Sequence, residues 1–131
     1  ARRTRQPLCV VYLDIDKFKG INDRFGHGAG DQVLRQLTAG IRATIRGSVD
    51  AGFRLGGDEF ALLLPSTMKA QAETIVARLR TLCAVHDPRW AVGTFDFSAG
   101  VVELEPDDTA AGLMTRSDAA MYREKNSRRT G

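Results

Sequence analysis

Residues 53–64 read FRLGGDEFALLL, two short apolar runs on either side of a glycine-rich tip. Apolar runs that flank such a tip are typical of a β-hairpin. Residues 8–15, LCVVYLDI, are rich in β-branched and aromatic residues and predict a buried strand that ends in carboxylates. Apolar residues alternate within 90–104 and predict a further strand. These segments are expected to form the sheet of the fold.

Apolar residues at helical spacing fill the intervals between these strands. A loop or short helix is expected over 16–30. Helices are expected over 32–46 with Asp31 as the N-cap and from Ser66 or Thr67 to the Asp87-Pro88 pair, and a last helix or helix pair from 107–109 to about residue 124. The order strand, helix, hairpin, helix, strand, helix predicts an α+β fold with a ferredoxin-like βαββαβ core. We therefore expect an antiparallel sheet that carries helices on one face and has its first strand beside the hairpin.

Length and composition limit the class of protein. The chain has 131 residues, enough for one domain. Its 43% hydrophobic and 27% charged residues exclude intrinsic disorder and collagen-like sequence, and no apolar run approaches the ~20 residues of a membrane-spanning helix. Cys9 and Cys83 lack metal-site spacing and are expected to be reduced core thiols. A net charge of +3 is too small to indicate a nucleic-acid partner, so we expect a soluble domain.

Carboxylates fall at two points that this topology would bring together. Asp14 ends the first strand, and Asp58 and Glu59 lie at the hairpin tip. Adjacent carboxylates repel unless a cation neutralises them, and Mg²⁺ combines one or two carboxylates with substrate phosphates. The pattern therefore predicts a metal-dependent nucleotide site. Solvated acids at an ordinary polar hairpin tip remain the alternative.

Three blocks carry a resemblance to a known family: DIDKFKGINDRFGHGAGD at 14–31, RLGGDEF at 54–60 and SDAAMYREKNSRR at 117–129. In order and spacing, over nearly the whole chain, they closely resemble the GGDEF family of diguanylate cyclases. The resemblance implies a palm-like, nucleotidyl-cyclase fold and an enzyme that condenses two GTP into cyclic di-GMP and pyrophosphate. It also implies a homodimer of facing sites, and GTP as substrate implies a cytoplasmic location, with the parent protein free to be membrane-anchored.

The resemblance also assigns roles to individual residues. Two Mg²⁺ or Mn²⁺ ions per site would be held by Asp14, the Ile15 carbonyl, Asp58 and Glu59. Glu59, together with Asp58, would be catalytic and would activate the attacking 3′-hydroxyl. Guanine would be bound by Asn22 and Asp31, and phosphates by the amides around Phe18 and Lys19 with Lys125 and Arg129.

Among the departures of the chain from the family pattern, two concern product binding and the extent of the domain. Many members carry an RxxD motif before the Gly-Gly pair, which binds the product and inhibits. Here Gly47 stands at the arginine position, Arg46 is one residue out of register and Asp50 is retained, so we expect this inhibitory site to be absent. The DxLTGLxNR segment usual upstream is missing, so residues 1–131 are expected to be a single GGDEF domain from a longer protein with sensor or effector domains.

Two other functions stay open at this point. The chain could be a catalytically silent GTP-binding regulatory module, although such a module has no need of intact Asp14, Asp58 and Glu59. A related palm-type polymerase or cyclase with another product is the second alternative, and Asn22 with Asp31 disfavours an adenine substrate.

Overall fold

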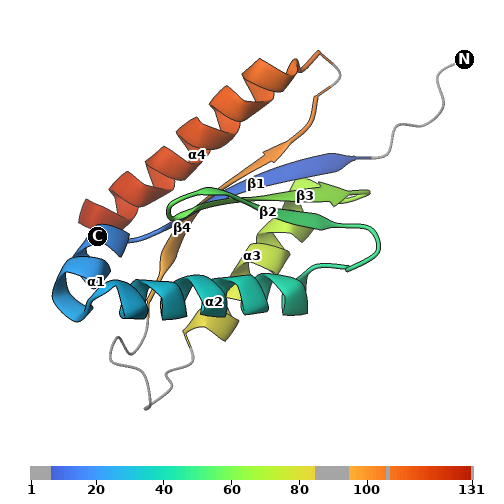
Figure 1. The fold of residues 1–131 in the computed structure, drawn as a ribbon. Helices are drawn as coiled ribbons and strands as arrows, with labels where there is room; N and C mark the ends of the chain where they lie inside the picture. The colour runs from blue at the N-terminus through green and yellow to red at the C-terminus, as the bar shows by residue number, and fades with distance from the viewer. Residues whose placement is uncertain (1–6, 85–94, 106, 131) are drawn as a thin grey trace, which may run out of the picture.

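The computed structural model describes residues 7–84, 95–105 and 107–130 (Figure 1). In chain order the elements are β1 (Leu8–Ile15), α1 (Phe18–Phe25), α2 (His27–Thr44), β2 (Ala51–Gly56), β3 (Glu59–Pro65), α3 (Lys69–Cys83), β4 (Phe97–Glu103) and α4 (Ala110–Thr130). The α+β class and the order of strands and long helices are as predicted. None of the helices in these ranges is both long and apolar enough to cross a membrane.

The sheet is antiparallel throughout, with strand order β2-β3-β1-β4. Strand β1 lies between the hairpin strand β3 and the edge strand β4, as the sequence predicted. The register pairs Asp14 with Glu59 on one side and with Ser98 on the other. The carboxyl end of β1 therefore meets the tip of the β2–β3 hairpin.

Helices cover both faces of the sheet, not one (Figure 1). On the first face α2 and α3 pack on the fully buried side chains of β1, such as Val11 and Leu13. On the other face α4 lies directly on β4, because a Cβ on Gly100 would come within 2.3 Å of the Met121 amide nitrogen. The predicted placement of helices on one face thus holds for α2 and α3 and is wrong for α4. Glycine without a side chain is what permits this close backbone approach.

Three helix boundaries differ from the sequence expectation. Helix α2 begins at His27 after Gly26 (φ 90°), so Asp31 lies inside the helix and is not its N-cap. The stretch 16–30, expected to be a loop or a short helix, forms α1 and the first turn of α2, in which Ala29 and Gly30 are buried. Helix α3 begins after Met68, not after Ser66 or Thr67, and helix α4 ends at Thr130, not near residue 124. The Asp87-Pro88 pair and the first part of the 90–104 strand lie outside the described residues.

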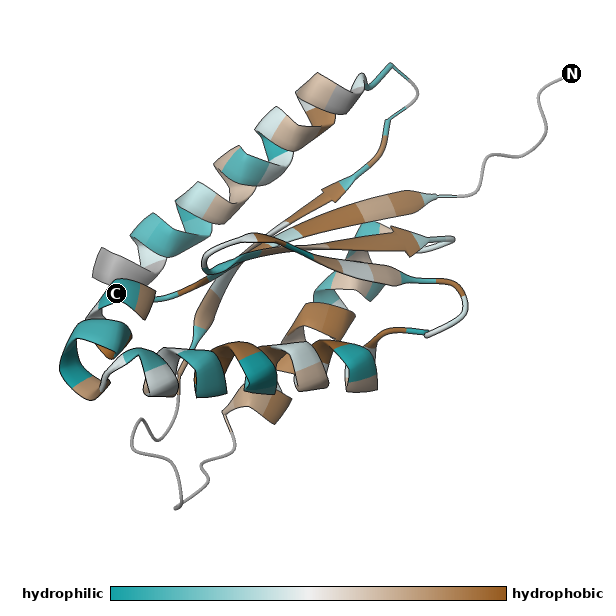
Figure 2. Ribbon diagram, viewed as in Figure 1, coloured by the Kyte–Doolittle hydropathy of each residue, from teal (hydrophilic) through white to brown (hydrophobic). Residues whose placement is uncertain are grey.

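Polarity changes along the molecule. Figure 2 shows hydrophobic residues concentrated in the sheet, whereas α1 and the C-terminal half of α4 are mostly hydrophilic. Cys9 and Cys83 are buried free thiols, as predicted, and burial raises the pKa of both to about 11. They are therefore protonated and unreactive at neutral pH.

Candidate functional site

Two carboxyl groups converge where β1 ends against the hairpin tip. The amide of Ile15 donates to the carbonyl of Asp58 at 3.1 Å, which holds the tip against β1. The tip itself bends at Gly56 (φ 149°) and Gly57 (φ 49°), both in backbone regions that favour glycine. The Asp14 side chain is 10% exposed. The predicted proximity of Asp14 and Asp58 is thus met in the structure.

The pKa of Asp58 reflects its closeness to Asp14. Burial raises the pKa of Asp58 to about 6, and hydrogen bonding to Asp14 and the Asp14 charge act in the same direction. Asp58 can donate to Asp14 only while it is protonated. When both groups are ionised, no donor among the described residues reaches the buried Oδ1 of Asp14. The pair is an anionic site with an unsatisfied buried oxygen, which a cation would satisfy.

Lys125 of α4 supplies the positive charge nearest to this pair. Its Nζ lies 2.5 Å from Oδ2 of Asp14, and its side chain is 30% exposed. Burial opposes the Lys125 charge, but the hydrogen bond and charge of Asp14, with further charge from Asp16 and Asp58, raise its pKa above the ordinary value. Residues 111 positions apart in the sequence therefore meet at one point, and Lys125 stays charged.

A cavity of about 670 Å³ opens beside these groups. Asp58 and Lys125 line it together with Lys17, Phe18 and Lys19 at the start of α1. The first amides of a helix have no partner within it, and Lys17 provides no side-chain cap. Free amides and lysine ammonium groups beside an open cavity form a site suited to phosphate oxygens.

The side chain of Asn22 in α1 lies against Gly30, the α2 residue that precedes Asp31. A Cβ on Gly30 would lie 1.9 Å from Oδ1 of Asn22, so the Asn22 side chain lies on the glycine next to Asp31. Asp31 is exposed and lines a second cavity, of about 510 Å³, with Leu34 and Phe60. An amide and a carboxylate are thus placed near each other, and the cavity beside Asp31 is also lined by Arg35, Arg42 and Arg54.

The remaining residues predicted to bind metal or phosphate include Glu59, Ile15 and Arg129. Glu59 is directly opposite Asp14 in the sheet register but is exposed. The side chain of Ile15 belongs to the core, so only its backbone is available to a ligand. The side chain of Arg129 lies outside what the structure describes. Within the described residues, no three acidic, histidine or cysteine side chains lie close enough to form a metal site alone.

Sequence reasoning missed two charged residues behind the site, Arg80 and Glu124. Arg80 of α3 donates to Oε1 of Glu124 at 2.8 Å, one residue before Lys125. A signal for Arg80 was present, because it follows the buried Val76 by four residues and so continues the apolar stripe of α3. An arginine on such a stripe needs acidic or carbonyl partners.

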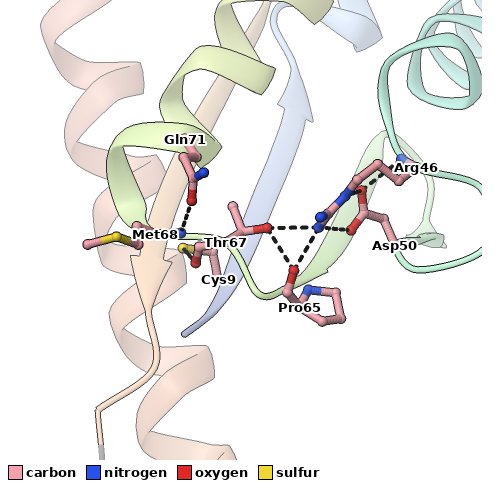
Figure 3. Close-up of polar contacts among 7 residues, drawn as sticks. All are labelled: Cys9, Arg46, Asp50, Pro65, Thr67, Met68 and Gln71. Carbon is pink, nitrogen blue, oxygen red and sulfur yellow. Dashed lines mark hydrogen bonds and ion pairs between the residues drawn. The ribbon is translucent and has the colours of Figure 1, made fainter. Parts of the chain in front are cut away.

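At the far end of β3 the retained aspartate is fully engaged (Figure 3). The Asp50 side chain is 0% exposed. Its Oδ2 accepts from the backbone nitrogen and Nε of Arg46 at 2.7 and 3.0 Å, and its Oδ1 accepts from Nη2 at 2.7 Å. The same Nη2 donates to the Pro65 carbonyl and to Thr67 Oγ1. Arg46, although shifted by one position, supplies a guanidinium to Asp50 after all.

Comparisons with known proteins agree with this geometry. The family described as diguanylate cyclase, GGDEF domain, matches residues 1–131. The chain is 38% identical over 128 residues to the probable diguanylate cyclase DgcE of Escherichia coli K12, covering 94% of this chain and 11% of that protein. It is 40% identical over 136 residues to the diguanylate cyclase TpbB of Pseudomonas aeruginosa PAO1, covering 98% and 30%. The chain thus spans a third or less of these two relatives.

Solved structures give the same result. The GGDEF domain of DgcB from Caulobacter crescentus, in complex with c-di-GMP, superimposes with a TM-score of 0.84 at 31% identity, over 92% of this chain and 73% of that one. The active GGEEF domain of a diguanylate cyclase from Vibrio cholerae gives 0.84 at 35% identity, over 93% and 78%. Sequence and fold together show that the chain belongs to the GGDEF-domain family of diguanylate cyclases.

Proposed function

We propose that this domain is a diguanylate cyclase that converts two GTP into cyclic di-GMP and two pyrophosphates. The observation that carries the proposal is the convergence of Asp14, Asp58 and Lys125 beside the free amides of α1. Acidic groups suited to cations and amides suited to phosphates occur together at one cavity. That combination is what phosphoryl transfer from a nucleoside triphosphate requires.

The acidic pair fits a divalent cation. The buried Oδ1 of Asp14 lacks a donor, and burial together with the neighbouring Asp14 raises the pKa of Asp58. We assign Asp14, Asp58, the Ile15 carbonyl and Glu59 as the groups that would hold two Mg²⁺ or Mn²⁺ ions. Bound cations would neutralise these carboxylates and act as Lewis acids toward phosphate oxygens and the attacking hydroxyl. Mg²⁺ needs only one or two carboxylates beside phosphates and water, so the absence of a three-acid cluster in the described ranges is compatible with this assignment.

Phosphate binding is assigned to the amides of Phe18 and Lys19 and to Lys125 and Arg129. Lys125 is bonded to Asp14 in the ligand-free domain, so its ammonium would turn toward phosphate oxygens when cations engage the carboxylates. Its proximity to Asp14 keeps it charged for that purpose.

Guanine selection is assigned to Asn22 and Asp31. The Asn22 amide can bond the N3 edge of guanine, and an ionised Asp31 can accept from N1–H and N2–H₂. Adenine offers no such pair of donors and would leave the carboxylate without partners.

Catalysis would need two copies of the domain. Each site would hold one GTP, and the 3′-hydroxyl of each GTP would attack the α-phosphorus of the other. A new P–O bond forms, the bond to pyrophosphate breaks, and Glu59, exposed opposite Asp14, would take the hydroxyl proton. Sensor or effector domains of the parent protein would then control activity by controlling dimerisation. Because GTP is intracellular, the domain would work on the cytoplasmic side, whether or not its parent is membrane-anchored.

Chromatographic separation of products tests this function. Purified protein, dimerised through a fused coiled coil, is incubated with GTP and Mg²⁺. Cyclic di-GMP and pyrophosphate are expected, and D58N, which removes one of the paired carboxylates, should abolish them. Tight GTP binding without any product would favour a silent regulatory module, and a different product would favour another type of palm-fold enzyme.

We also propose that product inhibition through the Asp50 position is weak or absent. Both oxygens of Asp50 are bonded to Arg46, which is in turn held by Pro65 and Thr67 (Figure 3). A guanine could bind Asp50 only after this ion pair opened and exposed a buried carboxylate. Calorimetric titration with cyclic di-GMP should detect no sub-micromolar site.

A further inference from the structure

Arg80 of α3 joins the two layers that lie on opposite faces of the sheet. Its Nη1 donates to Oδ1 of Asp96 at 2.5 Å and to the carbonyl of Phe97 at 2.7 Å. Its Nη2 donates to Oε1 of Glu124 in α4 at 2.8 Å. The guanidinium also lies over the Phe97 ring, 4.5 Å from its centroid. One side chain thus links α3, the start of β4 and α4.

Glu124 completes this link from the side of α4. The Oε1 atom that accepts from Arg80 also accepts from the amide of Ala99 at 3.0 Å. Strand β4 is an edge strand, so the Ala99 amide and the Phe97 carbonyl are among its groups that other strands leave unpaired. Arg80 and Glu124 bond one of each, so their ion pair closes over the edge of the sheet.

The position of this link on α4 gives it a consequence for the candidate site. Gly100 allows α4 to approach β4 closely near Ser117 and Met121, but close approach alone does not fix how the helix is rotated or shifted along its axis. Glu124 fixes both, because it bonds a defined amide of β4. The next residue is Lys125, whose ammonium reaches Asp14. A helix turned or shifted at Glu124 would move Lys125 by a similar amount.

We infer that Arg80 and Glu124 are positioning residues that set the Lys125 ammonium against the carboxylate pair and the phosphate cavity. Neither residue lines that cavity, although Arg80 bonds Asp96, which does. Both residues act on Lys125 through α4. The binding of phosphate by Lys125 rests on the proposed function. The effect of Arg80 on the position of Lys125 concerns the ligand-free domain and is independent of that function.

The matched control is a second arginine bridge on the same helix. Arg116 binds Asp108 and donates to the carbonyl of Glu103 at 3.1 Å, so it ties the first half of α4 to the other end of β4. R116Q therefore removes a comparable arginine bridge at a distance from Lys125. Variant E124Q keeps an acceptor for the Ala99 amide and loses the charge that attracts Arg80, whereas R80Q removes the cation.

Amine labelling followed by mass spectrometry measures the position of Lys125 directly. Wild type, R80Q, E124Q and R116Q are treated with a limiting acylating reagent at one pH, without metal or nucleotide. The 91% exposed side chain of Lys19 serves as the internal standard. Labelling of Lys125 relative to Lys19 should rise about fivefold in R80Q, which corresponds to the loss of one strong surface ion pair. It should rise less in E124Q and stay unchanged in R116Q. Equal Lys125 labelling in R80Q and wild type overturns the inference, and so does an equal rise in R116Q.

Kinetics then separate this inference from the proposed function. In an active dimer, R80Q should raise the KM for GTP with a smaller change in kcat, because a displaced lysine weakens ground-state and transition-state binding alike. R80K, which keeps a cation able to reach Glu124, should restore part of the loss. A protein that makes no cyclic di-GMP refutes the proposed function and leaves the labelling result standing. Normal product formation with unchanged labelling in R80Q refutes only the positioning role.

Discussion

Replacing Gly30 with alanine tests the guanine site without altering a residue assigned to bind the base. The new Cβ would lie 1.9 Å from Oδ1 and 2.8 Å from Cγ of Asn22. No atoms can approach so closely, so one of them has to move. The contact is with the end of a half-buried side chain and not with backbone, so we expect the Asn22 amide to rotate away while α1 and α2 keep their places.

The size of the effect follows from what this rotation removes. Asn22 would lose its hydrogen bond to guanine, a contribution of about 1 kcal/mol, which corresponds to roughly fivefold weaker GTP binding. Stability should change little, because alanine in place of glycine favours a helix by up to about 1 kcal/mol and offsets the cost of moving Asn22. Binding and stability should therefore separate in this variant.

Gly28 provides the matched control within the same helix. A Cβ at this position would meet nothing within 4 Å. G28A should gain helix stability and bind GTP as the wild type does. Calorimetric titration with GTP and with inosine triphosphate, which lacks the 2-amino group, together with thermal unfolding, compares the three proteins. If G30A binds GTP as tightly as G28A, Asn22 does not read the base from this position. The preference over inosine triphosphate, which depends on the group assigned to Asp31, should be the same in both variants.

Three further changes have defined outcomes. G100A places a Cβ against the backbone of α4, which cannot yield as a side chain can, so thermal unfolding should show a loss of about 1–3 kcal/mol. R46Q should destabilise the domain by about 2 kcal/mol at pH 7 because it leaves the carboxylate of Asp50 buried without its partner. Burial alone would raise the Asp50 pKa, but hydrogen bonds from Arg46 lower it below its ordinary value. The stabilisation of the folded domain by this ion pair is therefore present above the unfolded-state pKa of about 3.9 and is lost as pH falls through the folded-state pKa of Asp50. The difference between R46Q and wild type in chemical denaturation should therefore shrink below about pH 4, and a difference constant with pH would contradict this account. K125M removes the cation bonded to Asp14, so Mg²⁺ should raise the melting temperature of K125M more than that of the wild type, and an equal rise would show that Lys125 does not compete with the metal.

The convergence of Asp14 and Asp58 could be predicted because it depends on topology alone. A βαββαβ order puts the first strand beside the hairpin, and strand ends then bring the two carboxylates together whatever the details of packing. The strands and the long helices could also be predicted, from the short apolar runs and from the helical spacing of apolar residues. Their periods are local properties of the sequence.

Features decided by tertiary contacts could not be predicted in this way. Asp31 looks like an N-cap because it follows glycines, yet burial of Ala29 and Gly30 extends α2 back to His27. The one-residue shift of Arg46 predicted the loss of the product site, but it did not indicate that the turn folds back and lets Arg46 bind Asp50. In both cases a local rule was overridden by contacts that sequence spacing does not encode.

The core and the candidate site constrain each other through the alternation of β1. Leu13 and Ile15 are fully buried against α2 and α3, while Asp14, between them, points to the face of α4 and meets Lys125. A slip of β1 by one residue would turn the carboxylate into the apolar core and bring two large aliphatic side chains out. The exchange would lose the free energy of burying both aliphatic side chains, about 1.5–3 kcal/mol each, and would add the cost of burying an unpaired charge. The packing of the opposite face therefore fixes where the carboxylate lies, and mutations of Leu13 to smaller apolar residues should loosen the Asp14–Lys125 contact although neither residue is touched.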